Sequence, residues 1–358
     1  MRTTCARVAL MILIASLLAG CDATSRPTTK RIVLLTNGDS PYWDACRQGL
    51  KAAEAELKLA EAGLSVVMDV NSRAEQGQID MLRQYGSQRD VVAVGISAYH
   101  ADNAAMADEM RKLQAKGIKV IAVDNDVNRE RFRNARFAFV GTDNLRAGDE
   151  LGVAIRNLRP KGGEIVTFVG SPGAQNAVDR VRGVGDGAGE AFKMVDNMGD
   201  QFDRSRSRDN VRNAITNHPG VNVLVGIYSY NGPDIVDVVR QLKRRNDFTI
   251  VTFDAEPTAI KDMADGMLDC MIVQNPYMIG YESVRLMKAL VEDDQQTVKE
   301  MFPERGKDPD GDIYGTGLKI VVPDKGSPLK QDLFDASTEF LTLSAFKDWL
   351  ATYKLKGS

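Results

Sequence analysis

The chain of 358 residues carries 46 Lys and Arg against 49 Asp and Glu, a formal net charge of −3. This near balance, without a basic stripe, argues against a nucleic-acid partner. Two His and four Cys, with no C-x-x-C pair, supply no repeated metal-ligand pattern, so we expect neither a metal nor a cofactor. The length exceeds the roughly 250 residues at which single cores stop growing, which predicts two lobes.

The beginning of the chain has the pattern of an export signal. Arg2 and Arg7 are the only charges before Asp22, and residues 8–18 are almost wholly apolar. This apolar run is about half of the ~20 residues that cross a bilayer as a helix, so it is typical of a signal peptide. Residues 21–29 are mostly polar and contain Pro, which predicts a tether.

The segment Leu18-Ala19-Gly20-Cys21 ends the apolar run and resembles the lipobox of bacterial lipoproteins. In that family the Cys receives a diacylglyceryl group, and the signal is cut just before it. The resemblance implies a lipoprotein signal peptide over residues 1–20, a lipid anchor on Cys21 and a periplasmic protein attached to a bacterial membrane. The alternative is an ordinary signal peptide that contains a Cys by chance.

From residue 30 onward, short apolar runs alternate with amphipathic segments. In the first half we expect strands at 32–35, 65–70, 91–96, 120–123 and 137–140, and helices at 42–62, 74–85 and 102–116. The pattern then restarts, with strands at 164–169, 223–227, 249–253 and 270–273, and helices at 146–159, 179–193, 207–217, 233–244, 257–265 and 276–292. This order predicts two α/β lobes, each a doubly wound parallel sheet with right-handed crossovers.

Four glycines fall within one predicted helix, at positions 183, 185, 187 and 189. Each would weaken a helix by about 1 kcal/mol relative to Ala. Their spacing misses the third Gly of the G-x-G-x-x-G pattern, so a dinucleotide site is not expected. Residues 304–317 are rich in Asp, Gly and Lys and predict a loop, in which the stretch Asp308 to Asp312 lacks the Glu that an EF-hand requires.

Two cysteines remain once Cys5 is removed with the signal and Cys21 carries lipid. Cys46 and Cys270 could pair in an oxidising compartment. Each lies in an apolar context, which favours two buried free thiols.

Polar and aromatic side chains follow several of the predicted strands. A carboxylate at the carboxyl end of a parallel strand points into the crevice where open α/β sheets bind ligands. Such an ionised acceptor makes hydrogen bonds worth about 1.5–3 kcal/mol, and an aromatic ring covers an apolar C–H face. In chain order the motifs are Ser40-Pro41-Tyr42-Trp43, Asp124-Asn125, Thr142-Asp143-Asn144, Asp179-Arg180, Phe253-Asp254-Ala255-Glu256-Pro257 and Gln274-Asn275-Pro276.

In order and spacing, these motifs resemble those of the periplasmic sugar-binding proteins of the ribose-binding type, over about residues 31–322. The resemblance implies the type I periplasmic-binding-protein fold, with two lobes joined by a multi-strand hinge and no catalysis. It implies a monomer that captures a sugar or polyol and delivers it to the membrane permease of an ABC importer. The implied parts are a first lobe at 30–142 plus about 276–317, a second lobe at 143–275, and a hinge strand with a C-terminal helix at 318–358.

The resemblance also implies a ligand site. Aromatic residues would cover sugar C–H faces, two Asp would accept from hydroxyls, and an Arg would donate, with Arg182 as the alternative to Arg180. Thr142 and Gln274 lie at the two crossings between lobes. The expected ligand-binding residues are Ser40, Tyr42, Trp43, Asp124, Thr142, Arg180, Phe202, Ser229, Phe253, Asp254 and Gln274.

Some positions depart from the family pattern. Ser40 replaces the usual Asn, Asn125 stands where the ribose-binding subgroup often has Arg, and Ser229 begins a segment that replaces an Asn-Asp pair. These departures weaken the case for ribose itself. Three rival functions share parts of the pattern: a receptor that signals to a kinase or chemoreceptor, a repressor of the same fold, and an exported glycosidase. The export signal disfavours the repressor, and the glycosidase would need two carboxylates about 5–10 Å apart.

Overall fold

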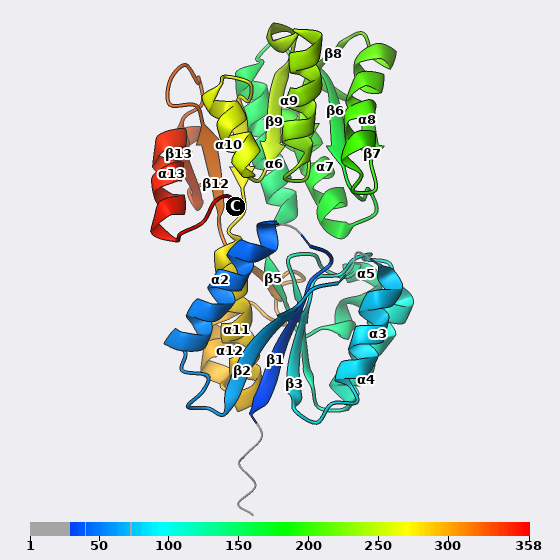
Figure 1. Cartoon of the computed structure of the whole chain (residues 1–358), viewed down its shortest axis with the longest axis vertical. Coiled ribbons are helices and arrows are strands. Elements are labelled where there is room, and N and C mark those ends of the chain that lie inside the picture. Colours follow the sequence, from blue (N-terminus) through cyan, green and yellow to red (C-terminus); the bar gives the residue numbers. More distant parts are fainter. Residues whose placement is uncertain (1–28, 40, 72–73) are drawn as a thin grey trace, which may run out of the picture.

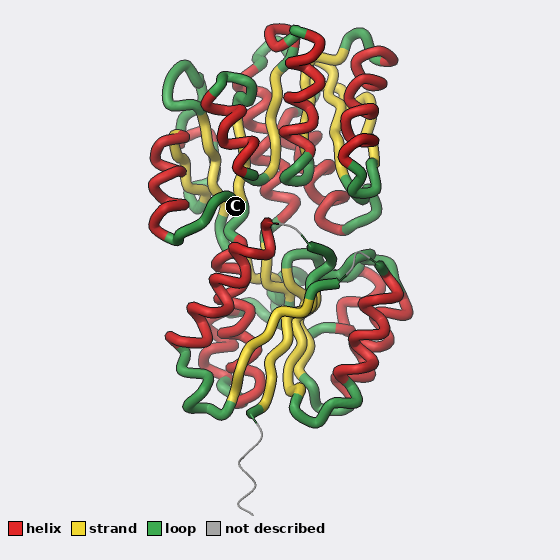
Figure 2. Tube along the Cα trace, in the orientation of Figure 1, coloured by secondary structure: helices red, strands yellow, loops and turns green. Residues whose placement is uncertain are grey.

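A computed structural model describes residues 29–39, 41–71 and 74–358 and shows two α/β lobes stacked along the long axis of the molecule (Figure 1). In each lobe a central sheet lies between layers of helices (Figure 2). The predicted fold class is therefore confirmed. The proposed signal peptide, the lipidation site Cys21, the tether up to residue 28 and Ser40 lie outside the described residues.

The first lobe has a six-stranded sheet in the order β11-β5-β4-β3-β1-β2, in which every pair is parallel. Its strands are β1 Lys30–Leu35, β2 Leu64–Asp69, β3 Val91–Ile96, β4 Lys119–Val123, β5 Phe139–Gly141 and β11 Ile313–Gly315. Its helices are α2 Pro41–Glu56, α3 Glu75–Tyr85, α4 Ala104–Ala115, α5 Arg129–Phe132, α11 Pro276–Glu292 and α12 Gln295–Met301.

Strand β1 shows how this sheet is buried on both faces. Ile32 and Leu34 pack into the core with helices α2, α11 and α12, whereas Val33 and Leu35 pack into the core with α3 and α4. Because successive strand residues point to opposite faces, a continuous apolar run is what such a strand requires.

The second lobe has a seven-stranded sheet in the order β13-β12-β10-β9-β8-β6-β7. Its strands are β6 Gly163–Val169, β7 Phe192–Gly199, β8 Val221–Gly226, β9 Thr249–Phe253, β10 Cys270–Val273, β12 Leu318–Val322 and β13 Thr338–Thr342. Its helices are α6 Asn144–Leu158, α7 Gln175–Ala188, α8 Arg204–Asn217, α9 Asn231–Leu242, α10 Pro257–Ala264 and α13 Leu343–Thr352. Helices α6 and α7 cover one face of the sheet, and α8, α9, α10 and α13 cover the other.

The structure corrects several expected elements. The helix expected over 179–193 is α7, which ends at Ala188, where Gly189 has φ +77°. Residues 192–199 form strand β7, which the sequence analysis missed because this half-exposed edge strand lacks a buried apolar run. Strand β12 pairs antiparallel with β10, so the sheet is not wholly parallel. Strand β11 lies within the expected loop 304–317.

The glycines of α7 allow an unusually close approach of α6. A Cβ atom added at Gly187 would lie 2.0 Å from the carbonyl oxygen of Asp149, and one at Gly183 would lie 2.2 Å from that of Leu145. On the facing helix, a Cβ at Gly148 would lie 2.2 Å from the carbonyl oxygen of Arg180. The loss of helix stability that these glycines cause is thus offset by close packing between the backbones of α6 and α7. This packing also fixes the position of Arg180.

The polypeptide crosses between lobes after β5, after β10 and after β11. Thr142, in the first crossing, donates from Oγ1 to Oε1 of Gln274, in the second, over 2.8 Å. Cys46 and Cys270 are free and buried, as the apolar contexts favoured. Within the described ranges, no helix combines the length and apolar character that crossing a membrane requires.

Candidate functional site

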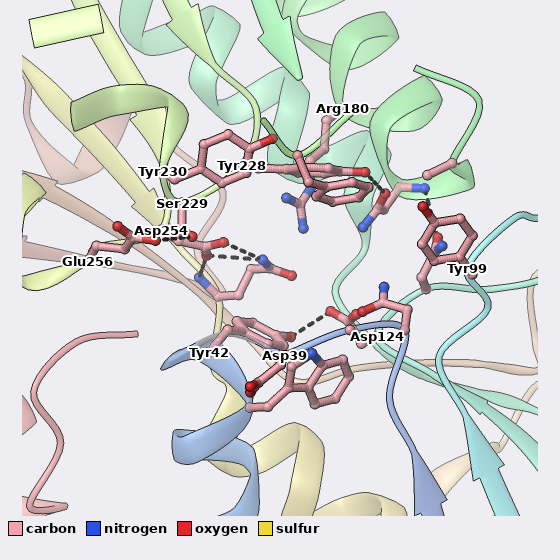
Figure 3. Close-up of a pocket in the computed structure, with 18 of the residues that line it drawn as sticks. Asp39, Tyr42, Tyr99, Asp124, Arg180, Tyr228, Ser229, Tyr230, Asp254 and Glu256 are labelled. Atoms are coloured by element: carbon pink, nitrogen blue, oxygen red, sulfur yellow. Dashed lines mark hydrogen bonds between the residues drawn. The ribbon is translucent and has the colours of Figure 1, made fainter. Parts of the chain in front are cut away.

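A cavity of about 260 Å³ lies between the two lobes, where the carboxyl ends of both sheets meet (Figure 3). Its first-lobe lining is Asn37, Gly38, Asp39, Tyr42, Trp43, Tyr99, Asp124 and Asn125. Its second-lobe and hinge lining is Ala174, Asn176, Arg180, Phe202, Arg204, Tyr228, Ser229, Tyr230, Asp254, Glu256 and Gln274. The volume lies just below the range for small-molecule sites, about 300–1,000 Å³, which suits a small ligand.

Asp124 is the carboxylate that the first lobe contributes. It directly follows β4 and has φ +64°, a left-handed conformation that turns the chain at the strand end. Oδ1 accepts from the hydroxyl of Tyr42 over 2.6 Å, and Oδ2 accepts from Oγ of Ser97 over 2.9 Å. Burial raises the pKa of Asp124, while the bond from Tyr42, the charge of Arg180 and the bond from Ser97 oppose this rise.

Asp254 is the corresponding carboxylate of the second lobe. It directly follows β9 and has φ +60°. The side-chain amide of Gln274 donates to both carboxylate oxygens, at 3.0 Å each. Burial raises the pKa of Asp254 to about 6, although the charge of Arg180 and the bonds from Gln274 act in the opposite direction.

Arg180 supplies the positive charge between these two carboxylates. Its side chain is 1 % exposed, and its guanidinium lies 4.3 Å from the centre of the Phe253 ring. Nε donates to Oδ1 of Asn144 over 2.8 Å, and Nη1 donates to the carbonyl of Ile227 over 3.0 Å. Nη2 is buried without a hydrogen-bond partner among the described residues. Figure 3 shows the guanidinium directed into the cavity, so this N–H group is available to a ligand.

Aromatic rings form two walls. Tyr42 and Trp43 meet edge to face with their centroids 5.2 Å apart on the first-lobe side. Phe202 and Tyr228 are stacked on the second-lobe side at 5.9 Å, and Tyr99 of the first lobe lies 6.2 Å from Phe202. Aromatic contact therefore spans the cleft as well as lining it.

The structure brings most of the predicted site together. Eight predicted residues line the cavity: Tyr42, Trp43, Asp124, Arg180, Phe202, Ser229, Asp254 and Gln274. Phe253 and Thr142 do not line it: Phe253, predicted as an apolar wall, is fully buried beneath Arg180, and Thr142 donates to the lining residue Gln274. The alternative Arg182 has a side chain 71 % exposed that pairs with Asp186, away from the cavity lining.

Several lining residues are not among those predicted from the sequence. Tyr228 and Tyr230 follow β8, and two aromatic residues at a strand end were the available signal. Asn125, a departure from the family pattern, also lines the cavity. Its Oδ1 accepts from the backbone N–H of Asn176 over 3.2 Å, which joins the two lobes directly.

The cavity continues to a polar end on the second lobe. Ser229 donates from Oγ to Oε1 of Glu256 over 2.9 Å, and Arg204 lies 3.6 Å from the other oxygen of Glu256. Arg204 also pairs with the buried Asp234 at 3.1 Å. No cluster of three or more His, Cys, Asp or Glu side chains suited to a metal occurs in the described part of the chain. Asp312, in the segment weighed against an EF-hand, instead pairs with two arginines.

Residues 32–295 match the model of the periplasmic binding protein domain. The chain belongs to this periplasmic binding protein family. Its members are solute-binding proteins without catalytic activity.

Among curated proteins, the ribose import binding protein RbsB of Bacillus subtilis (strain 168) is 21 % identical over 246 residues, 68 % of this chain and 75 % of the relative. The D-allose-binding periplasmic protein of Escherichia coli (strain K12) is 23 % identical over 265 residues, 71 % of this chain and 82 % of the relative.

Two solved structures show the same two-lobed fold. An ABC transporter solute-binding protein from Burkholderia graminis C4D1M, in complex with D-arabinose, aligns with a TM-score of 0.70 at 22 % identity, covering 83 % of this chain and 96 % of the other. GanP, a glucose-galactose binding protein from Geobacillus stearothermophilus, aligns with a TM-score of 0.69 at 23 % identity, covering 82 % and 97 %.

Proposed function

We propose that this protein is the substrate-binding lipoprotein of an ABC-type importer and captures a monosaccharide or related polyol by closing its two lobes. One observation carries the proposal: Asp124 and Asp254, from different lobes, flank an arginine with an unpartnered N–H group inside an aromatic-walled cavity. The relatives named for ribose and allose, and the relative solved with arabinose, support this ligand class.

The chemistry of the cavity suits a polyhydroxylated ligand. Ionised Asp124 and Asp254 accept hydrogen bonds from hydroxyl groups, and Nη2 of Arg180 donates to a hydroxyl oxygen. The ring of Trp43 and the Phe202–Tyr228 stack cover apolar C–H faces. A sugar presents both kinds of surface, so it satisfies the polar and aromatic groups together.

Closure follows from the division of contacts between lobes. A ligand held by Asp124 on one side and by Arg180 and Asp254 on the other makes all its bonds only when the lobes are together. Such a ligand shifts the equilibrium toward the closed form by its differential affinity for that form. A membrane permease would then bind the closed, monomeric protein.

The anchor belongs to the same proposal. A diacylglyceryl group on Cys21, with the signal 1–20 removed and a tether at 21–29, would hold the protein in the periplasm at a membrane surface. Tethering raises the effective concentration of the receptor near its permease. We propose lobe boundaries at 30–142 with about 276–317, and at 143–275. Strands β12 and β13 extend the second lobe's sheet, so part of 318–358 belongs there.

Thermal unfolding with added sugars tests the proposed function. Full-length protein in detergent is screened against pentoses, hexoses and polyols, and a bound sugar raises the melting temperature. We expect Arg180→Lys, which cannot reproduce the planar guanidinium, to lose most of this shift. The matched control Arg182→Lys, on the exposed side of the same helix, should keep it.

Two outcomes would contradict the proposal: no sugar shifts the melting temperature of the wild-type protein, or the pure protein hydrolyses a glycoside. The anchor is tested separately by intact mass. The expected species begins at Cys21 and carries a diacylglyceryl group. The Cys21→Ser variant should carry no lipid and should keep its signal peptide.

A further inference from the structure

The last residues of the chain return to the candidate ligand site. They lie beyond residues 32–295, the stretch that matches the family. Helix α13 packs on the second lobe through the buried Phe346 and Leu350. After it, Lys354 has φ +55°, and the N–H of Leu355 donates to the carbonyl of Leu350 over 2.9 Å, which turns the chain back. Figure 1 shows this end of the chain between the two lobes.

Ser358 forms three hydrogen bonds beside the carboxylate of the second lobe. The N–H of Ala255 donates to the main-chain oxygen of Ser358 over 2.6 Å, and the N–H of Ser358 donates to the carbonyl of Ala255 over 3.1 Å. Oγ of Ser358 donates to the backbone carbonyl of Gln274 over 3.0 Å. Ala255 directly follows Asp254, and the side-chain amide of Gln274 donates to both carboxylate oxygens of Asp254. Ser358 therefore restrains the backbone next to Asp254 and also the backbone of Gln274.

Gly357 permits this approach. A Cβ atom added there would lie 2.6 Å from the carbonyl oxygen of Ala255 and 3.2 Å from Cδ of Pro257. Real Cβ atoms do not approach a backbone oxygen so closely, so any side chain at this position would push the segment away from Ala255. Lys356, one residue earlier, is exposed and free of this constraint.

The same segment also contacts the first lobe. The ring of Tyr353 lies 4.9 Å from that of Tyr277, in the first turn of α11. Helix α11 packs in the core of the first lobe, and Tyr277 follows Gln274 by three residues along the crossing. Residues 353–358 therefore contact the first lobe at one end and the ligand-site backbone of the second lobe at the other.

We propose that residues 353–358 form a strap that positions Asp254 and Gln274 for the ligand, with Ser358 as the positioning residue. This inference rests on the proposed function of the cavity. Asp254 has the left-handed backbone conformation, which is uncommon for residues other than Gly although Asp adopts it more often than most, so neighbouring hydrogen bonds help to hold it. The paired backbone of Ala255 and Ser358 supplies that restraint, and the contact of Tyr353 with Tyr277 links it to the position of the first lobe.

Calorimetric titration of full-length protein with the sugar found in the thermal screen tests the strap. Gly357→Val should weaken binding about tenfold or more, since it displaces the whole segment. Ser358→Ala should weaken binding about fivefold, as expected for one neutral hydrogen bond. Ser358→Thr, which keeps the hydroxyl, should restore affinity, and Lys356→Ala should bind as the wild type does. Affinities of Gly357→Val and Ser358→Ala equal to that of Lys356→Ala would overturn the proposal.

Hydrogen exchange in the ligand-free protein separates the strap from the proposed function. The amide of Ala255 should exchange at least about tenfold faster in Gly357→Val than in Lys356→Ala, because its acceptor is the main-chain oxygen of Ser358. If the wild-type protein binds no sugar, the proposed function fails, yet this measurement still decides whether the strap holds the backbone at Asp254. Unchanged exchange at Ala255 would overturn the strap itself.

Discussion

The carboxylates of the two lobes occupy equivalent places but are held differently. Asp124 and Asp254 each follow a central strand, are buried and have φ near +60°. Asp124 accepts from two hydroxyl groups of its own lobe, whereas Asp254 accepts from Gln274, which lies on a crossing between the lobes. The first carboxylate is therefore a fixed part of one lobe, and the orientation of the second depends on the hinge.

Removing either negative charge should have the largest effect on binding. An ionised acceptor contributes about 1.5–3 kcal/mol per hydrogen bond, which corresponds to about 10- to 150-fold in Kd. We expect Asp254→Asn and Asp124→Asn each to weaken sugar binding by this amount in a calorimetric titration. An Asp254→Asn variant with wild-type affinity would show that the second carboxylate does not bind the ligand.

The packing of α6 against α7 places the arginine that both carboxylates share. We expect Gly148→Ala to destabilise the protein by about 1–3 kcal/mol and to weaken sugar binding, because its Cβ would collide with the backbone of Arg180. Gly185→Ala is the matched control, since a Cβ there meets no atom within 4 Å, and it should stabilise α7 slightly. Chemical denaturation and calorimetry measure both effects, and equal stability of the two variants would contradict this account of the glycines.

Mild acid should protonate Asp254, the carboxylate of the second lobe. Because burial raises the pKa of Asp254 to about 6, this group takes up a proton as the pH falls from 7 to 5, and sugar affinity should fall with it. The stability of the ligand-free protein should change in the opposite sense. A carboxyl whose pKa is higher when folded binds more protons in the folded state, so its contribution to the free energy of unfolding rises as the pH falls below about 6.

Asp254→Asn is the control for the pH dependence of both affinity and stability, because the amide at position 254 does not titrate. Its affinity and its stability should each vary less than those of the wild-type protein between pH 7 and 5. If the wild-type affinity were constant over this range, the ligand would not depend on ionised Asp254.

The smallest effect should come from the hydroxyl groups that hold the first carboxylate. Tyr42→Phe keeps the aromatic wall but removes the 2.6 Å bond to Asp124. Because this bond supports Asp124 and the negative charge remains, we expect only about a fivefold weaker affinity, less than the effect of removing the charge. Thr142→Val removes the corresponding support of Gln274 on the hinge. If Thr142→Val slows closure more than Tyr42→Phe in stopped-flow fluorescence, the contrast between a fixed and a hinge-dependent carboxylate is upheld; equal rates would contradict it.

Buried helices and strands were predicted from the sequence more accurately than half-exposed ones. The bounds of β3 and α11 agree with prediction, since β3 is a continuous buried run and α11 begins at a proline in its first turn. Asp124 and Asp254 were predictable because strand ends converge on the crevice of a parallel sheet. Edge strand β7 was not predictable, because its half-exposed residues do not form the continuous apolar run of a buried strand.

Contacts between segments distant in the sequence could not be predicted either. Phe253 precedes Asp254 and was predicted as a ligand wall, yet only the packing of α7 shows that Arg180 covers it. The bond from Thr142 to Gln274 and the return of Ser358 to Ala255 join residues more than 100 positions apart. Neither leaves a local pattern, because each depends on how whole elements are placed.

The unpartnered Nη2 of Arg180 has a consequence for the unloaded receptor. A donor buried without a partner costs about 1–3 kcal/mol. A hydroxyl oxygen of a bound ligand would remove that cost. If Arg180 binds the ligand as proposed, the same side chain would favour the closed form that holds a ligand over the closed form that holds none.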